Sequence, residues 1–147
     1  MDGTARHRIL VCTSCKGATP GSRPGPELIA ALRRELDRRG SAAIEVAGVA
    51  CMAGCSHPCT VGFQADGKAS YVFGDLSPEE DLADILSFTD LYQMLADGWC
   101  SSVDRPGKLR RCTLSRIPAL VPAAPAAAIP ASAIAPPAAL QQVEPAE

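Results

Sequence analysis

The chain has 147 residues and a formal net charge of −2, which allows one ordinary domain and leaves no general excess of basic residues. All fourteen Lys and Arg residues precede residue 117, together with fourteen of the sixteen acidic residues. This balance argues against a general nucleic-acid-binding protein, and the charged amino terminus does not resemble a secretion signal.

The pattern of apolar residues predicts alternating strands and helices. In chain order we expect a strand over 7–12, a helix over 27–39, strands over 42–50, 60–65 and 69–73, and helical stretches between Ser77 and Leu95. Asp66-Gly67 predicts a hairpin, and Ser77-Pro78-Glu79-Glu80 is a capping box with proline at the first helical position. A strand–helix–strand start predicts two parallel strands. The expected fold class is therefore α/β, a thioredoxin-like sandwich with a mixed four-stranded sheet in the order β-α-β-β-β-α.

The last thirty-one residues, 117–147, have a different composition. They contain seven prolines and twelve alanines but no lysine, arginine or aspartate. Proline breaks helices and alanine buries little area, so this stretch cannot offset the entropy lost on ordering. We expect a domain over 1–116 and a disordered tail over 117–147. The prolines also argue against a membrane span.

Seven cysteines are many for a chain of this length, and five of them lie in the first sixty residues. Cys12 and Cys15 form a C-x-x-C motif after the first strand, and Cys51 and Cys55 form a C-x-x-x-C motif after the second, with Cys59 following. Parallel neighbouring strands place both loops at one edge of the sheet. Four thiolates there suit a [2Fe–2S] cluster or a tetrahedral zinc ion. We expect Cys12, Cys15, Cys51 and Cys55 to hold the cofactor, and Cys59 to be a spare metal ligand.

Two other functions are compatible with these cysteines. One is a zinc-binding structural or adaptor module. The other is a thiol–disulfide oxidoreductase, because C-x-x-C beside a strand–helix–strand pattern is typical of thioredoxins. Against it, the helix is expected near Pro26, about ten residues after Cys15, too far for its dipole to act on Cys12. Cys51 and Cys55 would also have no role in a simple dithiol enzyme. We expect an electron carrier or metal-binding protein rather than an enzyme, in the reducing cytoplasm.

A basic segment follows Asp104. It contains Arg105, Lys108, Arg110, Arg111 and Arg116, and no acidic residue. Such a run is either a solvated edge or a docking surface for an acidic redox partner. We expect no nucleic acid and no membrane as partners.

Three other side chains have weaker signals. His57, between the last two clustered cysteines, is either an iron ligand or an exposed residue outside the metal's coordination. Cys100 and Cys112 lie far from the other cysteines in sequence and are expected to be ordinary thiols.

The segments 51–63 (CMAGCSHPCTVGF), 71–76 (YVFGDL), 105–111 (RPGKLRR) and 116–118 (RIP) resemble the uncharacterised DUF1636 family of predicted metal-binding proteins. The resemblance covers about residues 8–118. The chain is also similar to thioredoxin-like [2Fe–2S] ferredoxins, which include a peripheral subunit of respiratory complex I. By position, that resemblance implies Cys12, Cys15, Cys51 and Cys55 as cluster ligands, although the first pair is closer than is typical there. It implies electron transfer or redox sensing, and the DUF1636 resemblance implies a setting in cobalamin metabolism.

Overall fold

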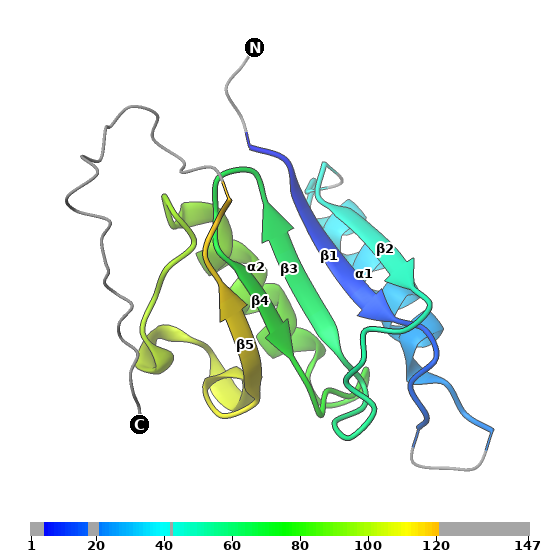
Figure 1. Ribbon diagram of the computed structural model, residues 1–147. Helices are drawn as coiled ribbons and strands as arrows, with labels where there is room; N and C mark the ends of the chain where they lie inside the picture. Colours follow the sequence, from blue (N-terminus) through cyan, green and yellow to red (C-terminus); the bar gives the residue numbers. More distant parts are fainter. Residues whose placement is uncertain (1–4, 18–20, 42, 121–147) are drawn as a thin grey trace, which may run out of the picture.

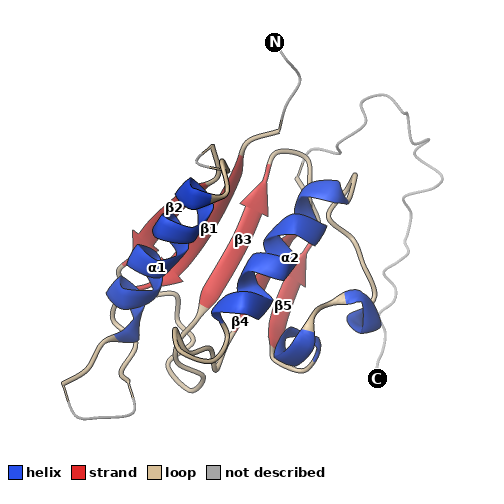
Figure 2. Ribbon diagram, turned by 180° about the vertical axis from the view of Figure 1, so that it is seen from behind, coloured by secondary structure: helices blue, strands red, loops and turns tan. Residues whose placement is uncertain are grey.

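The computed structural model describes residues 5–17, 21–41 and 43–120, which fold into two layers (Figure 1). One layer is a five-stranded sheet, and both α-helices cover the same face of it (Figure 2). In chain order the elements are β1 (His7–Cys12), α1 (Pro24–Arg38), β2 (Glu45–Val49), β3 (Val61–Ala65), β4 (Ser70–Phe73), α2 (Leu82–Met94), the short 3-10 helices η1 (Ser102–Asp104) and η2 (Gly107–Arg110), and β5 (Thr113–Ile117).

The strands lie in the order β2-β1-β3-β4-β5. β1 and β2 are parallel and are joined through α1, whereas β3, β4 and β5 add antiparallel neighbours. The predicted α/β class with a mixed sheet is confirmed, and the β2-β1-β3-β4 arrangement agrees with the expected thioredoxin-like outline. The expected number of four strands is wrong, because Thr113–Ile117 pairs with β4 as a fifth strand.

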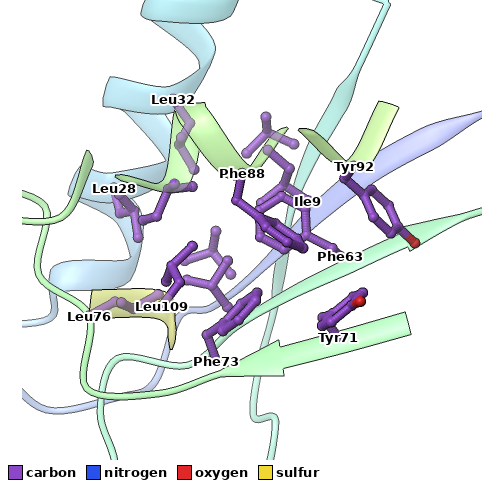
Figure 3. Packing of buried hydrophobic residues seen from close by; sticks show 14 of the residues in the cluster. Ile9, Leu28, Leu32, Phe63, Tyr71, Phe73, Leu76, Phe88, Tyr92 and Leu109 are labelled. Carbon is purple, nitrogen blue, oxygen red and sulfur yellow. The ribbon is translucent and has the colours of Figure 1, made fainter. Parts of the chain in front are cut away.

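Aromatic side chains fill the centre of the core between the sheet and the helices. They are Phe63, Tyr71 and Phe73 from the sheet and Phe88 and Tyr92 from α2 (Figure 3). The rings of Phe63 and Phe88 meet edge to face with centroids 4.8 Å apart, a geometry that aromatic quadrupoles favour. The buried Tyr71 hydroxyl donates to the carbonyl of Gly98 at 2.6 Å, so its polar atom is paired. This core fixes the strands whose ends carry the cysteines.

The helix boundaries differ slightly from those expected. α1 begins at Pro24, three residues before the predicted start at residue 27. The Ser77 hydroxyl accepts the backbone N–H groups of Glu79 and Glu80 at 3.2 Å each, so the expected cap forms. It caps a turn, however, and α2 begins only at Leu82. The capping signal therefore marks the correct place in the chain, one turn before the regular helix.

The end of the described chain joins the sheet. β5 includes Ile117, the first residue of the predicted tail, and from residue 121 onward that tail lies outside the described residues. Across 5–17, 21–41 and 43–120, no helix has the length and apolar character needed to cross a membrane.

Candidate metal centre

The sheet brings three cysteine-bearing segments to one edge. β1 ends at Cys12, which lies opposite Val49 near the end of the parallel strand β2. The N–H of Thr13 donates to the carbonyl of Val49 at 2.8 Å, and the N–H of Cys12 donates to the carbonyl of Thr60 at 3.0 Å. The loops that follow β1 and β2, and the segment that precedes β3, therefore meet where the sequence predicts the site.

Cys12 and Cys15 are buried at this edge, with 2% and 4% of their surface exposed. The first turn of α1 packs on them from the side, because Gly25 touches the backbone of Cys12 and Thr13. The helix start is therefore closer to Cys12 than its position in the sequence suggests, while the expected lack of a dipole effect on the Cys12 thiol stays a prediction. The N–H of Gly17 donates to the carbonyl of Ser22 at 3.0 Å, so the residue two positions after Cys15 lies beside the residues that precede α1.

Cys59 lies in the same buried place and is only 1% exposed. Its thiol donates to the carbonyl of Cys12 at 3.6 Å, and the Thr60 hydroxyl lies 3.9 Å from the sulfur of Cys15. Burial and the neighbouring Cys15 and Cys12 thiols raise the pKa of Cys59 to about 12. Cys12, Cys15 and Cys59 thus form a buried thiol trio, and a cation bound there would have to displace the proton of Cys59.

The two members of the C-x-x-x-C motif are placed differently. Cys51 and Cys55 are both exposed on the loop between β2 and β3. That loop lies against the trio, since the Thr60 hydroxyl, which contacts the Cys15 sulfur, also donates to the carbonyl of Gly54 at 3.4 Å. The structure therefore brings Cys12, Cys15 and Cys59 together and leaves Cys51 and Cys55 on the outer side of the adjacent loop.

The pKa values of the first pair diverge. Burial raises the pKa of Cys12, but hydrogen bonds from the Cys15 thiol, the Met52 N–H and Ser14 outweigh it and lower this pKa to about 7. Burial and the hydrogen bond that it donates to Cys12 raise the pKa of Cys15. One thiol of the pair is thus ready to bind a metal near neutral pH, and the other holds its proton.

The donor set fits a soft metal or an iron–sulfur cluster, because all five side chains at this edge are thiols. Within the described ranges, no three Cys, His, Asp or Glu side chains yet point at a common position suitable for an ion. Cys51 and Cys55 are exposed, and exposed side chains change rotamer within nanoseconds, so their present orientation is not fixed by packing.

Other predicted residues lie around this edge or away from it. His57 Nδ1 lies 3.0 Å from Asp75 Oδ2, and both side chains are about half exposed, so His57 pairs with a carboxylate. Cys100 and Cys112 are buried free thiols in the segment that flanks β5. The sequence reasoning missed Thr60 and Ser14, which contact the cysteine sulfurs; each lies one or two residues from a clustered cysteine.

The basic segment is only partly exposed. Arg105 is 7% exposed, with its guanidinium over the ring of Tyr71, and Lys108 forms an ion pair with Asp81 at 3.0 Å. Arg110 and Arg111 are exposed. Arg105 and Lys108 therefore contact the rest of the protein, as does Arg116, which donates to the carbonyl of Cys100 at 2.8 Å.

The raised pKa of Cys59 predicts a loss of stability at alkaline pH in the metal-free protein. Above pH 9 the thiol ionises in the unfolded chain but stays protonated in the folded chain up to about pH 12. The unfolded state then binds fewer protons, so the free energy of unfolding falls as pH rises. We expect a loss of about 2 kcal/mol between pH 8 and pH 10.5, measured by urea unfolding.

Cys59→Ala is the control for this measurement, because it removes only the thiol. The difference in stability between the two proteins should shrink by that amount over the same pH range. A constant difference would contradict the burial of this thiol beside Cys12 and Cys15.

Comparisons with known proteins give a family and a group of structural neighbours. A family model described as a protein of unknown function (DUF1636) matches residues 9–119, in agreement with the resemblance found in the sequence. No curated protein matches the sequence. Among solved structures, the chain is similar to a thioredoxin-like [2Fe–2S] ferredoxin from Aquifex aeolicus, with 18% identity, 75% of this chain and 91% of that chain covered, and a TM-score of 0.49. A second structure, the wild-type form of a thioredoxin-like [2Fe–2S] ferredoxin from the same organism, has 15% identity, coverages of 74% and 96%, and a TM-score of 0.49.

Proposed function

Because the chain belongs to the DUF1636 family, whose function is unknown, we propose a function from its own thiols: it binds a [2Fe–2S] cluster and acts in electron transfer or redox sensing. The supporting observation is that three free cysteines are buried together at one edge of the sheet and two more lie exposed on the adjacent loop. Cysteines that serve only as core residues need not lie close to one another. The cysteine ligands of a metal centre must lie close together.

Cys12 and Cys15 would bind one iron and Cys51 and Cys55 the other, with Cys59 as the spare ligand. The cluster, when bound, supplies one-electron chemistry. The chain would control the surroundings of the cluster: Cys12 and Cys15 are buried away from water, and the Ser14 hydroxyl, 3.7 Å from the Cys12 sulfur, would offset its negative charge. Cys51 and Cys55, on the exposed loop, would form the side open to a partner.

The setting of this function is also part of the proposal. A redox partner with an acidic surface would dock on Arg105, Lys108, Arg110 and Arg111, with Arg110 and Arg111 providing the exposed charge. The reducing cytoplasm suits seven free thiols. Cobalamin metabolism is the pathway that the family resemblance implies.

Anaerobic loading with iron and sulfide tests the proposal. We expect visible sulfide-to-iron absorption bands, about two irons and two sulfides per chain, and an EPR signal after reduction. A colourless protein that holds one zinc ion and takes up no iron would replace the cluster by the zinc-binding structural or adaptor function.

Thiol–disulfide exchange is a second candidate, and the lowered pKa of Cys12 favours it. The burial of both Cys12 and Cys15 is against it, because a substrate disulfide must reach the attacking sulfur. Insulin reduction by the metal-free protein separates the two functions. The oxidoreductase requires activity that is lost with Cys12→Ser or Cys15→Ser.

A further inference from the structure

The second cysteine loop is tied to the loop between β4 and α2. The backbones of Cys59 and Leu76 exchange two hydrogen bonds of 3.2 Å, and the N–H of Asp75 donates to the carbonyl of His57 at 2.9 Å. The side chains of His57 and Asp75 add a further contact of 3.0 Å. Movement of residues 57–59 must therefore move residues 75–76, or break these bonds.

Lys108 connects the loop between β4 and α2 to a further element, because it also contacts Asp75. Its ammonium group donates to the backbone carbonyl of Asp75 and to the carboxylate of Asp81, the latter at 3.0 Å. Asp81 is only 5% exposed and also accepts the N–H of Ser77 at 2.8 Å. One ammonium group thus joins η2 to the loop that holds the second cysteine segment.

η2 is also fixed to α2 through its backbone. The N–H of Lys108 donates to the carboxylate of Asp84 at 3.3 Å, and the carbonyl of Lys108 accepts the N–H of Cys112 at 3.2 Å. The N–H of Gly74 in turn donates to the carbonyl of Cys112 at 3.0 Å. In Figure 1, η2 and the cysteine loops lie along the same lower edge of the molecule.

We infer that Lys108 is a positioning residue, which clamps the second cysteine loop to η2 and so couples occupation of the cysteine site to the order of the exposed Arg110 and Arg111. The coupling half of this inference rests on the proposed metal-binding function; the clamp does not. Coupling between two sites is reciprocal, so whatever binds η2 would also hold the cysteine loop in place.

Hydrogen exchange of the metal-free protein tests the clamp. We expect Lys108→Met to speed amide exchange in residues 55–60 and 74–77 at least tenfold, because Asp75 and Asp81 lose a shared donor. Lys108→Arg keeps the charge and should restore most of the protection. The matched control is Arg111→Met. It removes an exposed cation directly after η2 and should leave these amides unchanged.

Equal exchange in the Lys108→Met and native proteins would overturn the clamp. If Lys108→Met does not fold, Lys108→Gln removes the charge but keeps a polar end, and it must then speed exchange in residues 74–77. Unchanged exchange there would also overturn it.

Titration of the native protein with cobalt(II) chloride tests the coupling, because thiolate ligation of Co²⁺ has its own visible bands. Loading should slow exchange in residues 107–111 at least threefold, and Lys108→Gln should remove this effect while the bands remain. Bands without slower exchange would overturn the coupling. No bands, with the clamp result intact, would overturn the metal-binding function and the coupling together but leave Lys108 as a structural clamp.

Discussion

Serine at both Cys51 and Cys55 is expected to reduce cluster loading to background while leaving the fold intact. Both side chains are exposed, so serine leaves no cavity and no unpaired buried group. The trio alone offers three thiolates, one fewer than a [2Fe–2S] cluster requires. Iron and sulfide content after anaerobic reconstitution, together with the melting temperature of the metal-free variant, measures both effects.

Two further variants decide between ligand sets. Cys100→Ser with Cys112→Ser removes two buried thiols outside this edge and should leave iron and sulfide content unchanged. Cys59→Ser should lower loading only in part if Cys59 is the spare ligand. The opposite result would be complete loss of iron and sulfide in Cys59→Ser and normal loading in the single variants Cys51→Ser and Cys55→Ser. It would show that Cys12, Cys15 and Cys59 are the essential ligands.

The parts of the fold that could be predicted are those in which a short sequence pattern agrees with the structure that the whole domain adopts. β1 occupies the expected residues 7–12, and Gly67 adopts the positive φ of 71° that the Asp66-Gly67 turn requires. β5 has no such signal. Its sequence Thr-Leu-Ser-Arg-Ile lacks a continuous apolar run and is only partly buried, because it forms the last strand of the sheet. Its pairing with β4 is decided by tertiary contacts that no sequence pattern specifies.

The site was predictable in its location but not in its internal arrangement. Parallel pairing of β1 and β2 sets the edge at which the cysteines meet. The sequence spacing is the same from Cys51 to Cys55 as from Cys55 to Cys59, so it cannot say which thiol is buried. That choice follows from β3: Cys59 precedes its first residue by two positions and is held by backbone bonds to Leu76, whereas Cys51 and Cys55 lie earlier in the loop and are exposed.

The contact between α1 and the first cysteine loop can be tested at Gly25. A Cβ at this position would overlap the carbonyl oxygen of Cys12 and lie 2.9 Å from the Cα of Thr13, and neither backbone atom can move independently of β1. Alanine is intrinsically better than glycine in a helix by about 1 kcal/mol, so helix propensity alone predicts that Gly25→Ala stabilises the protein. The steric argument predicts the opposite sign. We expect the free energy of unfolding to fall by about 2 kcal/mol, as for other overpacked sites.

Gly48→Ala provides the matched control, because it adds the same methyl group on the neighbouring strand. Its Cβ would meet Cγ2 of Thr13 at 2.7 Å and Cδ1 of Ile29 at 3.2 Å, which are ends of side chains that can rotate. It should therefore cost less than about 1 kcal/mol in urea unfolding of the metal-free protein. Gly25→Ala should also lower iron loading, since relief of the overlap must shift Cys12 away from Cys15 or α1 away from both. A Gly25→Ala protein that is more stable than the native one and loads normally would show that the helix start does not constrain the first cysteine loop.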